Sequence, residues 1–163
     1  MDIFFKYDKE GDETLLMRNS DIKITYPLKS FHDVIWHILS FFRFICGQKS
    51  ARFRRWTLIN SKGEVISFAH TIGKIFQFPF MENDGIHIGP CETSIDNRGK
   101  GYYPLMLNYI IHSMPNSNFY MIVDEYNISS IKGVLKTGFK PFAFGRRTRF
   151  LKRYIIVEHI NEI

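Results

Sequence analysis

The alternation of hydrophobic and polar residues along the chain predicts a mixed α/β fold. Apolar runs with the period or length of short β-strands occupy 2–7, 14–18, 54–60, 64–72, 86–95 and 118–124. Two further strands are expected on either side of the basic turn 145–149. Helical spacing of apolar residues predicts helices over 31–47 and 103–114. A third, short helix is predicted between Asn127, a favourable N-cap, and Gly138, a favourable C′ residue.

The turn signals between these elements agree with one continuous sheet. The sequence Ser-Lys-Gly at 61–63 predicts a tight hairpin between two of the strands. Pro90 cannot donate to a β-ladder, so it is expected at a bulge or an edge position. Because the chain has no internal repeat and no linker rich in Pro, Gly or Ser, we expect a single domain over 1–163. Its central sheet should have about six to seven strands flanked by about three to four helices.

Length and composition are those of an ordinary globular domain. The chain has 163 residues, of which 45% are hydrophobic and 23% charged. Its longest apolar stretch, 34–46, is interrupted by His37 and Arg43, so no membrane-spanning helix is expected. The acidic beginning does not resemble a secretion signal, and Cys46 and Cys91 lack metal-ligand spacing. These features predict a cytoplasmic protein without a metal centre.

Positive charge is concentrated near the end of the chain. The sequence carries 22 Lys and Arg against 16 Asp and Glu, and eight of the basic residues, with no acidic one among them, lie within 132–153. Such a field favours an anionic partner, for which nucleic acid, a phosphorylated metabolite and a membrane surface are all candidates. A solvated pair of strands without a partner is the structural alternative.

A glycine-containing turn between a predicted strand and a predicted helix offers the clearest candidate chemistry. Gly99 and Gly101 would let the backbone approach a ligand closely, and the free amides at the start of a helix favour a negative group. Arg98 and Lys100 add positive charge, and Pro104 is tolerated in the first helical turn. The segment therefore predicts a phosphate site, although its spacing matches neither a Walker loop nor a dinucleotide fingerprint.

The order of these motifs resembles the GCN5-related N-acetyltransferase (GNAT) family. The family signature is Arg or Gln, then Gly three residues later, then Gly or Ala two residues after that. Arg98 and Gly101 meet it, whereas Tyr103 departs from its last position. A second segment, 127–139, is similar to the family's Asn-x-x-Ser-Ile and Lys-x-Gly-Phe motifs. The run 93–107 also resembles small acetyltransferases found with surface-polysaccharide genes.

The resemblance implies a GNAT-like domain that transfers an acetyl group from acetyl-CoA to an amine of a small acceptor, such as an amino sugar or a nucleotide-linked sugar. Residues 81–163 would bind acetyl-CoA, and residues 1–80 would form the acceptor side. The pantetheine arm would lie between two parallel strands that splay apart, and a backbone amide near Glu92 or Thr93 would polarise the thioester. The implied cofactor-binding residues are Thr93, Arg98, Gly99, Lys100, Gly101, Tyr102, Tyr103, Asn127 and Ser130.

The catalytic residues are less clearly marked in the sequence. Many GNAT enzymes place a tyrosine acid four residues before the Gly-Phe pair, and here that position is Val134. Glu92 and His87 lie on the predicted active-site strand and are candidate general bases, and Tyr126 is a further catalytic candidate nearby. For each of these three residues, a purely structural role is the alternative.

Two other interpretations of the sequence stay open. The basic and aromatic segment 132–153 could bind single-stranded nucleic acid, although no RNA-binding or helix-turn-helix signature is present. The chain could also be a non-catalytic acyl-CoA-binding protein of GNAT-like fold, which would account for the missing tyrosine at position 134. We expect the acetyltransferase, with acetyl-CoA as cosubstrate and no nucleic-acid partner. Phe-rich surfaces could support a homodimer.

Overall fold

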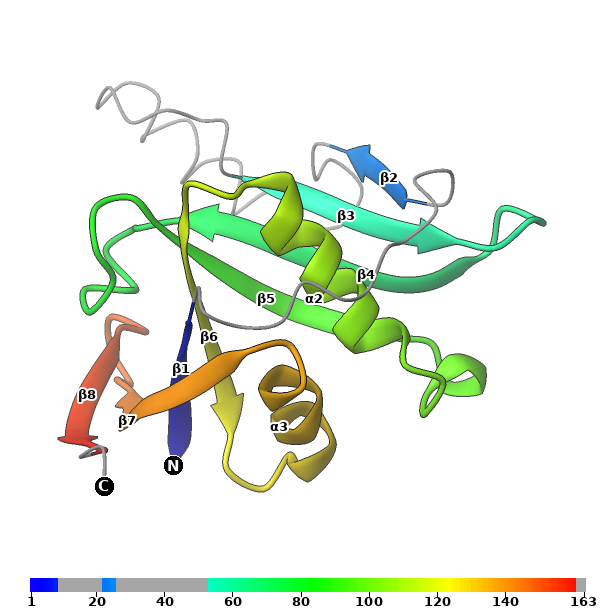
Figure 1. Cartoon of the computed structure of the whole chain (residues 1–163). Helices are drawn as coiled ribbons and strands as arrows, with labels where there is room; N and C mark the ends of the chain where they lie inside the picture. Colours follow the sequence, from blue (N-terminus) through cyan, green and yellow to red (C-terminus); the bar gives the residue numbers. More distant parts are fainter. Residues whose placement is uncertain (9–21, 26–52, 161–163) are drawn as a thin grey trace.

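One eight-stranded mixed sheet organises the part of the chain that the computed structural model describes, residues 1–8, 22–25 and 53–160 (Figure 1). The strands are β1 (Asp2–Tyr7), β2 (Ile22–Thr25), β3 (Arg54–Ile59), β4 (Val65–Gly73), β5 (Gly85–Thr93), β6 (Asn118–Asp124), β7 (Phe139–Arg147) and β8 (Tyr154–His159). Their order in the sheet is β2-β3-β4-β5-β6-β1-β7-β8. The helical elements of the described residues are η2 (Ile95–Asn97, a 3₁₀ turn), α2 (Tyr102–Ser113) and α3 (Ile128–Leu135).

The predicted mixed α/β sheet is confirmed, and so is the hairpin formed by β3 and β4. The chain turns at Gly63, whose φ of 82° is left-handed, and Asn60 Oδ1 accepts hydrogen bonds of 2.9 Å from the amides of Lys62 and Glu64. The short strand β2 was not predicted. The predicted strand over 14–18 and the predicted helix over 31–47 lie outside the described residues.

Strand β1 connects the two parts of the sheet. It is antiparallel to both of its neighbours, with Phe4 opposite Ile122 of β6 and Ala143 of β7. The side chains of Phe4 and Phe5 are 0% and 1% exposed. The hairpin β7–β8 is therefore joined to the rest of the sheet through the first strand of the chain.

Both faces of the sheet are covered by apolar side chains. Figure 1 shows α2 lying across β3, β4 and β5, and the buried side chains of α2 pack there with Ile86, Ile88 and Phe119. Because strand residues alternate between faces, Tyr120 of β6 packs in a second cluster that also contains Phe78 and other residues from loop 74–84. Among the described residues, none of the helices is both long and apolar enough to span a membrane.

Strands β5 and β6 are parallel and separate after a short paired segment. Only 85–87 of β5 pair with β6, whereas β5 stays paired with β4 as far as Thr93. The pairs Ala69–Cys91 and Thr71–Ile88 enclose one residue of β4 but two residues of β5, so an extra residue forms a bulge at 89–90. The bulge predicted from Pro90 is thus confirmed, and it lies where the two parallel strands part.

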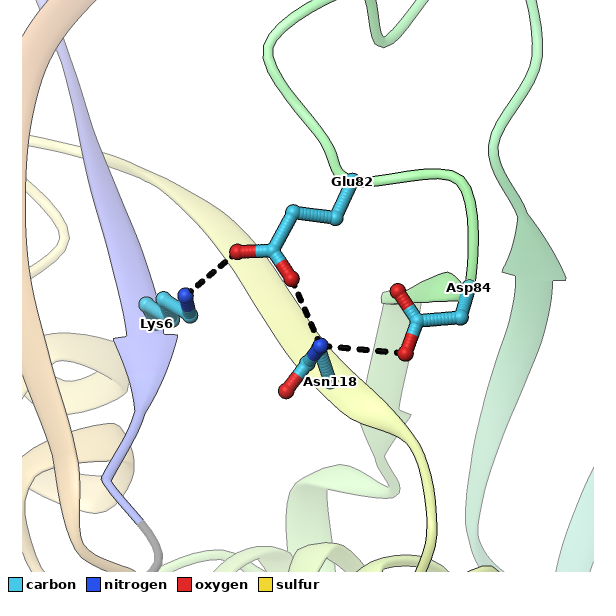
Figure 2. Close-up of polar contacts among 4 residues, drawn as sticks. All are labelled: Lys6, Glu82, Asp84 and Asn118. Atoms are coloured by element: carbon cyan, nitrogen blue, oxygen red, sulfur yellow. Dashed lines mark hydrogen bonds and ion pairs between the residues drawn. The ribbon is translucent and has the colours of Figure 1, made fainter.

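A polar cluster holds the other end of this parallel pair closed (Figure 2). Glu82 Oε1 contacts Lys6 Nζ of β1 at 2.7 Å, and Glu82 Oε2 accepts a hydrogen bond of 2.7 Å from Asn118 Nδ2 of β6. Asp84 accepts from the same amide at 3.1 Å. The ion pair raises the pKa of Lys6 and lowers the pKa of Glu82. The cluster connects loop 74–84 to β1 and β6, so β5 and β6 separate only toward their carboxyl ends.

Candidate functional site

A cavity of about 470 Å³ lies where β5 has left β6. Its walls come from the end of β5, the loop before α2, the first turn of α2 and one side of α3. The lining residues are Cys91, Glu92, Thr93, Asn97, Arg98, Gly99, Gly101, Tyr102, Tyr103, Pro104, Asn127, Ser129, Ser130, Lys132, Gly133 and Lys136. The cavity therefore lies beside the end of β5, between the loop before α2 and the start of α3.

The loop before α2 presents backbone rather than side chains to the cavity. Gly99 and Gly101 have φ values of 74° and 82°, and a Cβ at either position would meet no atom within 4 Å. Glycine is therefore required for the left-handed backbone and not for space. Gly101 is the N-cap of α2 and has no side chain that could accept a hydrogen bond. The amides of the first helical turn are therefore not capped by a side chain. Arg98 Nε donates to the carbonyl of Thr93 at 3.1 Å and ties the loop to β5.

The start of α3 forms the opposite wall. Asn127 Oδ1 accepts hydrogen bonds from the Ser130 amide at 3.2 Å and from Ser129 Oγ at 3.0 Å, so the predicted N-cap is confirmed. Two helices thus begin at one cavity. The positive ends of both helix dipoles favour an anion between them.

Charged side chains at the cavity add to this field. Arg98, Lys132 and Lys136 are exposed, and within the described residues none of the three has an ion-pair partner. Glu92 is the one carboxylate among the described lining residues. The cavity therefore carries a net positive charge and is suited to a ligand with several negative groups.

Tyr103 closes one side of the cavity by packing against α3. A Cβ on Gly133 would lie 2.5 Å from Cδ1 of the Tyr103 ring, so the ring fits only because residue 133 is glycine. Burial raises the pKa of Tyr103, with a smaller contribution from nearby Cys91, and burial raises the pKa of Cys91 to about 12. Both groups are thus neutral at physiological pH. Cys91 also packs against the core, which is the contact expected of a small apolar residue.

The structure brings together most of the residues singled out in the sequence. Of the nine predicted cofactor-binding residues, the cavity is lined by all except Lys100, whose Nζ lies 3.5 Å from Asn97 Oδ1. Of the three catalytic candidates, Glu92 lines the cavity, whereas His87 and Tyr126 do not. Tyr126 is 83% exposed, and its backbone amide donates to Asp124 Oδ1.

His87 belongs to the second core cluster rather than to the cavity. Its ring stacks on Phe78 with 4.3 Å between centroids, and within the described residues neither ring nitrogen has a hydrogen-bond partner. Burial lowers the pKa of His87 to about 3, so the imidazole is neutral. It lies directly beside the β5 bulge, since a Cβ on Gly89 would be 2.9 Å from His87 Cε1.

Several lining residues were missed in the sequence. Ser129, Lys132, Gly133 and Lys136 follow one another at intervals of three, one and three residues, so they share one face of α3 with the N-cap Asn127. This helical spacing groups the residues on one face, and only the assembled structure shows that this face of α3 turns toward the cavity. Val134, where a catalytic tyrosine was expected by resemblance, is 0% exposed and points into the core instead.

The basic segment 132–153 does not form one surface. Lys132 and Lys136 line the cavity, whereas the side chains at the β7–β8 turn contact loop 74–84. There the Arg153 guanidinium lies 4.4 Å from the centre of the Phe76 ring. Within the described residues, no group of three or more His, Cys, Asp or Glu side chains is placed to hold a metal ion.

Comparison with solved structures identifies the fold. A GNAT-family acetyltransferase from Colwellia psychrerythraea superposes with a TM-score of 0.59 at 10% identity and covers 86% of this chain and 52% of its own. A putative GNAT-family acetyltransferase from Novosphingobium aromaticivorans gives a TM-score of 0.55 at 13% identity, with 86% and 59% covered. A functionally unknown conserved protein from Staphylococcus epidermidis gives 0.53 at 11% identity, with 86% and 57% covered.

These similarities show the fold of the chain. The described chain has the fold of the GCN5-related N-acetyltransferases, as the sequence motifs implied. It spans between 52% and 59% of the length of the three solved chains. No family model and no curated sequence matches the chain.

Proposed function

We propose that this chain is an acetyltransferase that uses acetyl-CoA and acetylates an amine of a small acceptor. The observation that carries the proposal is the cavity itself, which lies beside the end of β5, beyond its last pair with β6, and receives the N-termini of α2 and α3. The fold of the structural neighbours supports the same assignment. An amino sugar or a nucleotide-linked sugar is the acceptor class we favour, from the resemblance of the run 93–107.

The residues present fit acetyl-CoA. A volume of about 470 Å³ lies in the range of small-molecule sites. The bare backbone of 99–101 allows close approach of a pyrophosphate, and Arg98, Lys132 and Lys136 supply charge for it and for a further phosphate. When bound, acetyl-CoA would supply an activated thioester.

The chain's own groups would then position acetyl-CoA and polarise its thioester carbonyl. Amides of 101–103 would donate to phosphate oxygens, and Asn127 and Ser130 would contact the arm. A backbone amide near Glu92 or Thr93, beyond the bulge, would donate to the carbonyl oxygen as negative charge develops on it. We assign the general base to Glu92 because it is the catalytic candidate on the cavity wall; it would take the amine proton directly or through water.

The first test is thermal unfolding with and without acetyl-CoA. At about 100 times its dissociation constant the ligand should add roughly 2.7 kcal/mol, a rise in Tm of about 5–10 °C. Arg98→Ala and Gly101→Glu should both reduce this shift. Lys62→Ala, on the exposed β3–β4 turn, is the matched control and should keep it. If acetyl-CoA, CoA and longer acyl-CoAs all leave Tm unchanged, the proposal is wrong.

Turnover separates catalysis from binding alone. Release of free CoA should be followed with a panel of amino sugars, with Glu92→Gln as the key variant. We expect Glu92→Gln to lose about a hundredfold or more in kcat while its thermal shift with acetyl-CoA stays as in wild type. A normal thermal shift without turnover on any amine would instead favour a non-catalytic acyl-CoA-binding protein.

A further inference from the structure

The turn between β7 and β8 combines exposed apolar side chains with a dense group of cations. Phe150 is 92% exposed and Leu151 is 49% exposed, and Phe76 of the neighbouring loop is 59% exposed. The basic residues of this turn and its flanks are Arg146, Arg147, Arg149, Lys152 and Arg153. We call these eight residues the hairpin patch. Exposed apolar side chains that gather in one place and are rimmed by charged residues are typical of an interaction site.

Hydrogen bonds hold the turn in this projecting form. The amide of Thr148 donates to the carbonyl of Arg153 at 2.7 Å, and the amide of Arg153 donates back to Thr148 Oγ1 at 2.9 Å. The amide of Tyr154 donates to the carbonyl of Gln77 at 2.9 Å, which fixes the base of the turn to loop 74–84. The apex is therefore presented by a rigid support.

Within the part of the chain that the structure describes, most of the positive charge of the hairpin patch has no acidic neighbour, and the exception is Arg147, which lies near the Asp2 carboxyl. The sequence from 126 to 157 contains no Asp or Glu. Among the described residues, Arg146, Arg149 and Lys152 have no ion-pair partner. The patch is thus apolar at its apex and cationic immediately behind it.

We propose that the hairpin patch docks the protein on an anionic lipid bilayer. Phe150 and Leu151 would enter the boundary between headgroups and acyl chains, and the surrounding cations would meet anionic headgroups. A single-stranded nucleic acid fits less well, because stacking needs several free aromatic faces. Here Leu151 is aliphatic and the Arg153 guanidinium already covers the Phe76 ring, which leaves Phe150 alone.

This surface is separate from the cavity. None of the hairpin-patch residues is among those that line the cavity, and the patch contacts loop 74–84 instead. Membrane docking therefore does not rest on acetyl-CoA binding, and each can be tested without the other.

The test is co-sedimentation of the whole chain, without acetyl-CoA, with phosphatidylcholine vesicles that contain or lack about one third phosphatidylserine. We expect binding to the anionic vesicles only, and release by salt. Phe150→Ser should lower the partition coefficient about tenfold. The double variant Arg149→Gln and Lys152→Gln should lower it about twentyfold or more.

The β3–β4 hairpin provides matched controls, because it carries an exposed cation, Lys62, and a half-exposed apolar residue, Val65. Lys62→Gln and Val65→Ser should bind anionic vesicles like wild type, and all variants should unfold at the wild-type temperature. The proposal is overturned if anionic vesicles do not bind the protein, or if both hairpin-patch variants bind as well as the controls. Binding of oligothymidylate through Phe150, without vesicle binding, would assign the patch to nucleic acid instead.

Discussion

His87 places a titratable ring inside an apolar cluster without a hydrogen-bond partner among the described residues. Its position follows from strand alternation, because Ile86 and Ile88 on either side face the helices. The stack on Phe78 keeps the imidazole flat against an aromatic ring, so the side chain acts here as an aromatic filler. It thereby links the β5 bulge to loop 74–84.

Burial of His87 predicts a loss of stability in mild acid. The pKa of about 3 in the folded protein is below the unfolded value of 6.5, so below pH 6.5 the unfolded chain binds a proton that the folded chain does not. Stability should therefore fall with pH between about 6.5 and about 3. From about pH 7 to about pH 5 the contribution of His87 is about 2 kcal/mol.

The measurement is urea unfolding of wild type and His87→Phe at both pH values. The variant keeps the stack but cannot titrate, so the pH-dependent loss should be about 2 kcal/mol smaller than in wild type. An equal loss in wild type and His87→Phe would show that His87 is not held neutral.

At the scale of elements, the contact between α2 and α3 depends on one large and one small side chain. Tyr103 occupies the signature position where the GNAT pattern has Gly or Ala, and Gly133 lies opposite it. The large Tyr103 on α2 is thus accommodated by the absence of a side chain at Gly133 on α3. Both residues line the cavity between the two helix starts.

Gly133→Ala is expected to separate these helices. The new methyl group would lie 2.5 Å from the Tyr103 ring, so the variant should lose about 1–3 kcal/mol despite the better helix propensity of alanine. Its thermal shift with acetyl-CoA should also shrink. In a Tyr103→Ala background the same change should cost nothing, and the double-mutant cycle measures the coupling energy. A coupling energy near zero would contradict the packing described.

The sequence was most informative where local signals decide the structure. The hairpin at 61–63, the bulge marked by Pro90, the N-cap Asn127 and the glycine loop before α2 all depend on neighbouring residues, and all were predicted. The insertion of β1 between β6 and β7 was not predictable in this way. It depends on pairing across more than a hundred residues, which no local pattern encodes.

The candidate site also contains residues that local sequence signals predict and residues that only the assembled structure places. The backbone cradle at 98–103 was evident from glycines and flanking elements, whereas the lining by Lys132 and Lys136 required knowledge of which face of α3 turns inward. The position of His87 on the opposite face followed only from the assembled sheet. Residue types indicated the chemistry, and the three-dimensional arrangement determined which of them meet.

At the scale of the whole molecule, β1 makes the sheet continuous. Phe4 is 0% exposed, its ring centroid is 4.7 Å from that of Phe80, and its Cζ would lie 2.4 Å from a Cβ on Gly145. A single side chain thus joins loop 74–84 to β7. The hairpin β7–β8 depends on this strand for its attachment.

Phe4→Ala should destabilise the protein by about 3–5 kcal/mol. Because the lost contacts join β1 to β7, amide hydrogen exchange should rise first in β7 and β8. Ile24→Ala, a half-exposed position at the other edge of the sheet, should change stability by no more than about 0.5 kcal/mol. Uniform exchange across all strands in Phe4→Ala would mean that β7–β8 has no separate dependence on β1.

The central place of β1 also has a consequence for biosynthesis. A ribosome makes this strand before its partners at 118–124 and 139–147, which emerge more than a hundred residues later, about ten seconds afterwards. During that interval Phe4 and Phe5 have no strand to pair with. The nascent chain must therefore keep an apolar β-segment from aggregating until β6 and β7 have been made, which makes β1 the natural point of contact for a chaperone near the ribosomal exit.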